Sequence, residues 1–79
     1  MYNEIKVKKV LMDEFRSQRI SHDLSLEEMA EILEITPRAY IDLENGRYMC
    51  KAKVLINFLL FLDNSEELIK KLRNTTDNK

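Results

Sequence analysis

The segment from residue 24 to residue 46, LSLEEMAEILEITPRAYIDLENG, constrains the fold of this chain more than any other feature. Ser25, with a glutamate three residues later, has the pattern of a capping box, in which two side chains satisfy amides at the start of a helix. Thr36 followed by Pro37 marks a second helix start, because proline at the first helical position loses no hydrogen bond. Gly46 can adopt the left-handed conformation that ends a helix. The segment therefore predicts two short helices joined by a tight turn, the second over residues 37–44.

The rest of the chain also predicts helices. Apolar residues recur at helical spacing over 4–20, over 52–62 and in a last helix capped by Ser65. With 79 residues and only one glycine and one proline, the chain is expected to form one all-α domain of five helices. We place this domain at residues 10–72, with a lead-in over 1–9 that is part of the first helix or precedes it, and a polar tail over 73–79.

Several function classes are excluded by what the sequence lacks. One cysteine, Cys50, and one histidine are too few for a metal site, and no cofactor is expected. No nucleophile with a base and no glycine-rich phosphate loop is present, so we expect no enzyme and no small-molecule ligand. The longest apolar run, 54–62, is far short of the ~20 residues of a membrane span. No signal peptide is evident, so we expect a cytoplasmic protein that binds no membrane.

The strings LSLEEMAEIL and TPRAYIDLENG resemble the phage repressor and Cro-type helix-turn-helix family, also called the xenobiotic-response-element type. The resemblance covers about residues 10–72. It implies a compact repressor-like domain with a central helix-turn-helix, and a regulator that binds double-stranded DNA. Two positions depart from the family pattern. Leu26 replaces a glutamine that holds a phosphate, and Glu34 replaces the glycine of the turn.

The resemblance also implies roles for individual residues. It places Pro37, Arg38 and Asp42 where the family reads base edges. Arg38 can donate two hydrogen bonds to guanine, and Asp42 can accept one from cytosine. Pro37 offers only apolar contact, and Ile41 either touches a methyl group or sits at the rim. By the same similarity, an arginine at the end of the first helix pairs with the glutamate of the ENG sequence, as the structural ion pair Arg19–Glu44.

Phosphate contacts position a domain of this kind on DNA and supply most of its nonspecific affinity. The candidates lie near helix N-termini, whose amides attract anions, or carry polar and basic groups around the loop after residue 44. They are Ser25, Thr36, Asn45, Arg47, Lys51 and Lys53.

The helix predicted over 52–62 is apolar on nearly every side, which predicts that one face packs in the core and another meets a partner. The expected partner is a second copy of the chain, since two recognition helices ~34 Å apart would read successive major grooves. The residues proposed for this homodimer contact are Leu60, Phe61, Leu68, Ile69 and Leu72.

Two functions stay open. The first is a sequence-specific transcriptional regulator, a repressor by resemblance, that inserts helix 37–44 into the major groove as a homodimer. The second is a protein-interaction module, such as an antirepressor, an antitoxin-like partner or an accessory subunit, with weak or no DNA binding. The net charge of −1, Leu26, Pro37 and Asp42 favour the second function, because many DNA-binding domains are strongly basic.

Overall fold

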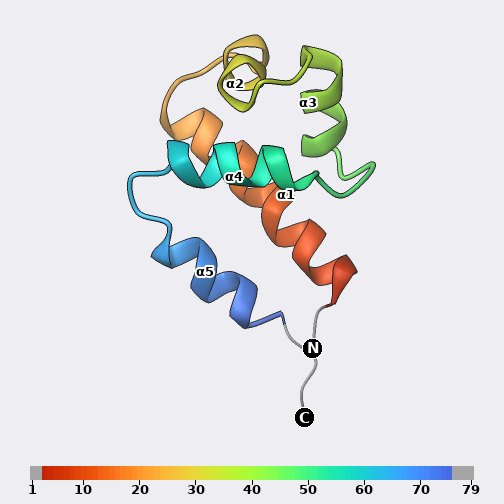
Figure 1. Cartoon of the computed structure of the whole chain (residues 1–79), viewed down its shortest axis with the longest axis vertical. Coiled ribbons are helices and arrows are strands. Elements are labelled where there is room, and N and C mark those ends of the chain that lie inside the picture. The colour runs from red at the N-terminus through yellow and green to blue at the C-terminus, as the bar shows by residue number, and fades with distance from the viewer. Residues whose placement is uncertain (1–2, 76–79) are drawn as a thin grey trace.

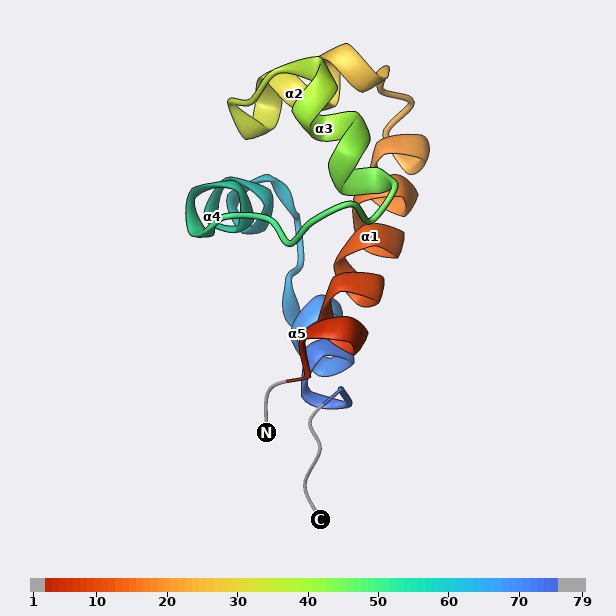
Figure 2. The ribbon, with the colours of Figure 1, turned by 90° about the vertical axis from the view of Figure 1, so that its right-hand side faces the viewer.

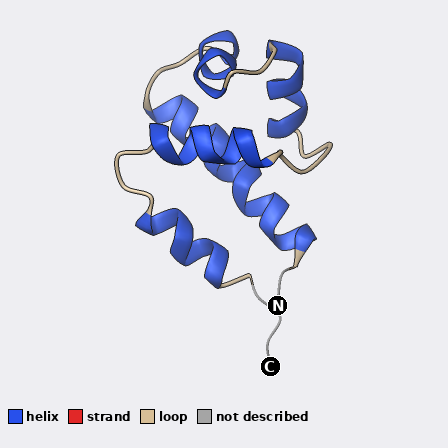
Figure 3. Cartoon of the chain, in the orientation of Figure 1, coloured by secondary structure: helices blue, strands red, loops and turns tan. Residues whose placement is uncertain are grey.

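Five α-helices and their connections make up residues 3–75, the part of the chain that this computed structural model describes (Figures 1 and 3). The helices are α1 (Glu4–Ser21), α2 (Leu26–Leu33), α3 (Pro37–Glu44), α4 (Ala52–Phe61) and α5 (Glu66–Arg73). The expected all-α fold is confirmed. Because α1 begins at Glu4, residues 4–9 of the expected lead-in belong to it. Residues 1–2 of that lead-in and 76–79 of the expected tail lie outside the described residues.

The start of each of the first three helices is satisfied by a side chain at its N-cap. The Asn3 side chain accepts from the amide of Lys6 at the start of α1. At α2, Ser25 accepts from the Glu28 amide at 3.0 Å, and the Glu28 carboxylate accepts from the Ser25 amide at 2.8 Å. Thr36 accepts from the amide of the third residue of α3. Because these caps are local, helix starts of this kind can be read from sequence.

The turn between α2 and α3 bends at Glu34, which has a left-handed backbone with φ of +61°. A residue with a Cβ is strained there, so the position departs from the family's glycine at a cost of about 1 kcal/mol. Gly46 takes the same region after α3, with φ of +72°. A side chain there would also meet Met12 of α1. The left-handed residues Glu34 and Gly46 therefore set the directions in which the chain enters and leaves α3.

One apolar core joins all five helices. Its fully buried side chains are Phe15, Met29, Leu33, Tyr40, Phe58 and Leu68. Phe15 of α1 lies at the centre, with its ring edge-on to those of Tyr40, at 6.3 Å, and Phe58, at 4.6 Å between centroids. Burial of such rings stabilises the fold by about 2 kcal/mol each or more.

The helices form two unequal ends along α1. In both views α2 and α3 lie beside the C-terminal half of α1, and α5 lies beside its N-terminal half (Figures 1 and 2). α4 crosses between them and packs against α2. The helix-turn-helix therefore sits at one end of the molecule, where α3 has one side free of other helices.

Two local expectations need correction. Ser65 precedes α5 but its side chain makes no capping hydrogen bond; instead Asn64 Oδ1 accepts from the Glu66 amide at 2.9 Å. The apolar residues at helical spacing over 4–20 were expected to form one buried side, yet Ile5 among them is 80% exposed. Ile5 lies in the first turn of α1, where α5 covers only one flank of the helix.

Candidate nucleic-acid interface

The inner face of α3 is fixed by apolar packing and by one buried carboxylate. Tyr40 and Leu43 are buried in the core, and Glu44 at the end of the helix is only 5% exposed. Arg19 Nε of α1 donates to Glu44 Oε2 at 2.7 Å, and Arg19 Nη1 donates to the Leu24 carbonyl at 3.2 Å. The structure thus brings together the two residues expected to pair, and the pair ties α1 to the end of α3.

Two further groups complete the surroundings of Glu44. The Tyr40 hydroxyl donates to Glu44 Oε2, and Arg16 Nε lies 3.6 Å from Glu44 Oε1. Burial alone would raise the pKa of Glu44. The hydrogen bonds from Arg19 and Tyr40 and the charges of both arginines outweigh burial and lower that pKa below its ordinary value. Burial and the bond to Glu44 raise the pKa of Tyr40, so this hydroxyl stays protonated and donates.

The outer face of α3 is open. Pro37 is exposed, the Arg38 side chain is 77% exposed, and Ile41 is half-buried. Arg38 can therefore reach a ligand that approaches α3 from outside. The eight residues of this helix thus divide into an anchored face and an accessible face, as a groove-binding helix requires.

Asp42 lies between two arginines. Its Oδ1 is 3.8 Å from Arg38 Nε and 3.3 Å from Arg47 Nε, and its side chain is only 18% exposed. Two guanidinium groups therefore lie close to the carboxylate and partly offset its charge. Asp42 therefore repels an approaching phosphate less than an unpaired carboxylate on α3 would.

Basic side chains outnumber acidic ones around α3. Lys51 and Lys53 are exposed at the start of α4, and Lys53 Nζ lies 3.7 Å from Glu34. Together with Arg38 and Arg47, they give four cations against the carboxylates of Glu34 and Asp42. Thr36 and Asn45 are exposed at the two ends of α3. Around the outer face of α3 these four cations exceed the two carboxylates, although the whole chain has a net charge of −1 and α2 at the same end carries Glu27, Glu28 and Glu31.

The N-terminus of α2 is less suited to an anion. Leu26 is half-buried and packs against the core, so it offers no polar group. Ser25 is exposed, but its amide already donates to Glu28. Glu27 and Glu28 place two negative charges in the first turn, whereas the first turn of α3 has no acidic residue. Of the two helix starts, that of α3 is the better phosphate site.

The residues expected at a dimer contact do not share one environment. Leu60 is 78% exposed, and Ile69 is exposed. Phe61 and Leu72 are half-buried, and the Phe61 ring lies 4.8 Å from that of His22. Leu68 is wholly buried, so its place in the contact is corrected: it belongs to the core that attaches α5 to α1.

Two charged contacts were missed in the sequence. Arg16 was not part of the predicted ion pair, yet its Nε lies 3.6 Å from Glu44 Oε1. Glu14 is buried and accepts from Lys71 Nζ of α5 at 2.9 Å and from Gln18 Nε2 at 3.1 Å. Glu14 could have been noticed, because it lies three residues after Leu11 and thus on the buried side of α1.

Residues 3–75 contain neither a metal-binding cluster nor a membrane-spanning helix. No group of three or more histidine, cysteine or acidic side chains there could hold a metal ion. Within the same residues, every helix is too short or too polar to cross a bilayer.

Comparison with known proteins gives one match. A family model described as helix-turn-helix matches residues 15–69, which is more than half of the chain. No curated protein and no solved structure matches the chain.

Proposed function

Because the chain belongs to the Cro/repressor-type helix-turn-helix family, a family of DNA-binding regulators, we propose that it is a sequence-specific transcriptional repressor. In this proposal two copies bind as a homodimer, and each inserts α3 into the major groove of double-stranded DNA. Occupying a promoter is enough for repression, since it keeps other proteins from the same sequence.

The observation that carries the proposal is the division of α3 into two faces. Tyr40, Leu43 and Glu44 hold the helix from inside, while Arg38 extends from its outer side. A guanidinium on a fixed helix can donate to both O6 and N7 of guanine. Pro37 and Ile41 then offer apolar contact to thymine methyl groups, and Asp42 orients Arg38.

Backbone contacts would come from the positive region around α3. Arg47, Lys51 and Lys53 are the cations, and Thr36 supplies a hydroxyl at a helix start whose first turn has no acidic residue. Asn45 and, more weakly, Ser25 complete the phosphate contacts. A dimer that neutralises six to eight phosphates loses affinity by about a thousandfold between ~50 and ~200 mM salt.

The direct test is selection of genomic DNA by the purified protein, followed by affinity measurements on the selected duplex at several salt concentrations. The proposal expects one enriched, two-fold symmetric sequence and the steep salt dependence given above. A promoter that carries this sequence should lose transcription when the protein is present. Increased transcription would contradict the repressor role alone.

The dimer contact is proposed on the exposed apolar side chains of α4 and α5. Ile56 and Leu60 lie one turn apart on α4, both largely exposed, and Ile69 is the exposed apolar residue of α5. Phe61 and Leu72 would lie at the edge of this contact. Two exposed apolar side chains one turn apart on the same helix suit a contact with a second copy of the chain.

Replacing Leu60 with glutamate should therefore give a folded monomer, measured by sedimentation or light scattering. A desolvated charge in the contact should weaken dimerisation about tenfold or more. Ile5→Glu is the matched control, because Ile5 is as exposed but lies on α1, and it should leave the dimer intact. A Leu60→Glu protein that stays dimeric would remove this contact from the proposal.

A protein-interaction module is the second candidate, favoured by the exposed side of α2. Glu27, Glu28 and Glu31 are all exposed there, and Leu26 packs inward. An acidic surface suits a basic protein partner better than DNA. Absence of DNA retention even at low salt would favour this function, such as an antirepressor, an antitoxin-like partner or an accessory subunit.

A further inference from the structure

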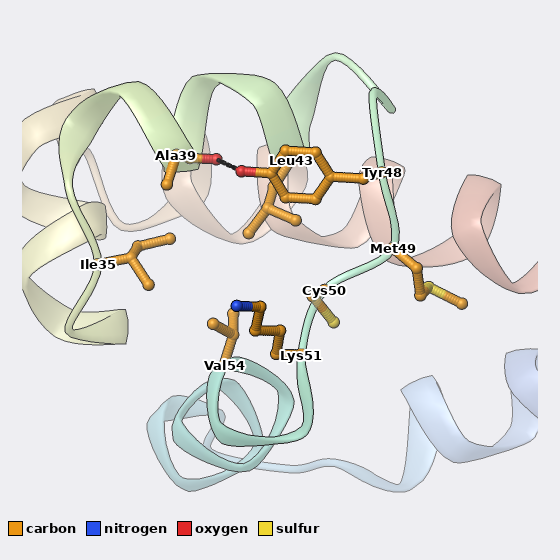
Figure 4. Close-up of a pocket in the computed structure, with 8 residues that line it drawn as sticks. All are labelled: Ile35, Ala39, Leu43, Tyr48, Met49, Cys50, Lys51 and Val54. Carbon is orange, nitrogen blue, oxygen red and sulfur yellow. Dashed lines mark hydrogen bonds between the residues drawn. The ribbon is translucent and has the colours of Figure 1, made fainter.

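A cavity of about 470 Å³ lies between α3, the loop that follows it and the start of α4 (Figure 4). Its volume is within the range of roughly 300–1,000 Å³ that is usual for small-molecule sites. Most of its lining is apolar and comes from both helices, the loop and the turn before α3: Ile35, Ala39, Leu43, Met49, Cys50 and Val54. The cavity is thus large enough and apolar enough to hold a small organic molecule.

Two polar side chains also line the cavity. The Tyr48 hydroxyl donates to the Ala39 carbonyl at 3.3 Å and so ties the loop to α3. Lys51 is the charged residue of the lining, and Figure 4 shows its side chain on the α4 side of the cavity, with its nitrogen beside Val54. No carboxylate of residues 3–75 forms an ion pair with Lys51, whereas nearby Lys53 faces Glu34 at 3.7 Å. The cavity therefore presents one uncompensated positive charge at the edge of an apolar space.

We propose that this cavity binds a small organic acid, with an apolar body against Ala39, Leu43 and Val54 and a carboxylate paired with Lys51. Charge complementarity selects this class over neutral or cationic molecules. The apolar lining favours an alkyl or aryl chain over a sugar or an amino acid. The proposed occupant departs from the expectation, made from the sequence, that the chain has no small-molecule ligand.

The position of the cavity gives binding a consequence. Ala39 belongs to α3, and Lys51 is one of the phosphate contacts in the proposed function. An acid bound here would neutralise Lys51 and so weaken attachment to DNA. This consequence rests on the proposed function, whereas binding of the acid itself does not.

Binding is tested on the DNA-free protein with octanoate, using octanamide and octylammonium as neutral and cationic counterparts. Amide NMR shifts follow each titration below micelle-forming concentrations. Octanoate should give saturable shifts centred on Ala39, Leu43 and Met49. Octanamide should bind about fivefold more weakly, the ratio expected for one half-exposed ion pair. Octylammonium should bind more weakly still.

Matched variants separate the charge from the cavity. Lys51→Met should bind octanoate and octanamide equally, and Lys51→Arg should restore the preference for octanoate. Lys53→Met is the control: it removes a neighbouring charge that does not line the cavity, and it should keep the preference. Ala39→Met should fill the cavity and weaken the binding of both octanoate and octanamide.

Four outcomes would overturn the proposal. The first is no saturable octanoate binding, and the second is a preference for octanoate that survives in Lys51→Met. The third is shifts centred on Leu60 and Ile69, which would indicate general apolar binding at α4 and α5. Concentration-dependent shifts around the cavity without any ligand would instead place a second copy of the chain there, and would also contradict the proposal.

Adding octanoate to the complex with selected DNA tests the consequence. Saturating octanoate should lower the salt slope of DNA binding by about one per protomer. Octanoate binding by a protein that holds no DNA would leave the cavity proposal standing and remove the proposed function. Retained DNA binding without octanoate binding would do the reverse.

Discussion

Two carboxylates of this protein are buried to the same degree, and each forms a joint, that is, a side-chain contact that connects two helices. Glu44, 5% exposed, joins α3 to α1, and Glu14, 6% exposed, joins α1 to α5. Glu44 receives hydrogen bonds from Arg19 and Tyr40 and lies near a second arginine. Glu14 receives one bond from a lysine, whose side chain is 53% exposed, and one from a glutamine of its own helix.

The two joints differ in how firmly they hold their helices together. The Glu44 joint is enclosed and has several donors, so α3 is held in one position relative to α1. The Glu14 joint opens to solvent through Lys71, so water can replace the lysine at little cost. A helix that contacts bases must be positioned more accurately than a C-terminal helix. The firmer joint at α3 agrees with this requirement.

Removing Glu44 should give the largest effect. In Glu44→Ala the Arg19 guanidinium and the Tyr40 hydroxyl lose their shared acceptor inside the protein, which should lower the free energy of unfolding by about 3 kcal/mol. Urea denaturation measures this loss. In the double mutant with Arg19→Ala, the loss should be smaller than the sum of the two single losses. Additive losses would show that the two residues are not coupled.

Acid should weaken the Glu44 joint selectively. The pKa of Glu44 is lower in the folded protein than its ordinary value of 4.5, so its contribution is complete above that value and disappears as pH falls through the folded pKa. Between about pH 5 and pH 3, the wild type should lose more stability than Glu44→Ala. Equal pH dependence of the two proteins in urea titrations would contradict this.

The smallest effect is expected at the other joint. Lys71→Met should lower the free energy of unfolding by about 1 kcal/mol or less, because the ion pair is half-exposed. The hydrogen bond and charge of Glu14 raise the pKa of Lys71, so this contribution is present below about pH 10.5 and is lost as pH rises further. DNA affinity should not change. A loss of unfolding free energy as large as that in Glu44→Ala would show that the two joints are equally strong.

Local signals in the sequence predicted most of the fold. The capping box at Ser25, Pro37 after Thr36, and Gly46 gave helix bounds within about one residue, because caps and turns depend on neighbours in the chain. The predicted cap at Ser65 was wrong because the Ser65 backbone is α-helical, with φ of −86° and ψ of −2°, whereas a capping residue has an extended backbone.

Contacts between distant segments were harder to foresee. Glu14 and Lys71 are 57 residues apart, and no local pattern links them. Asp42 faces Arg47 only because the chain turns back after Gly46, which a sequence pattern cannot show. Leu68 was assigned to a dimer contact because periodicity identifies an apolar stripe but not what covers it. The cavity beside Lys51 likewise depends on the path of a loop.

The central claim is that the outer face of α3 contacts bases. The affinity of Arg38→Ala for the selected duplex tests this claim most directly. Arg38 is exposed and outside the core, so the variant should fold as stably as the wild type. Its affinity for the selected duplex should fall by about 1–3 kcal/mol per site, with a much smaller loss on random duplex. Equal losses on the two duplexes, or no loss on either, would contradict base reading by α3.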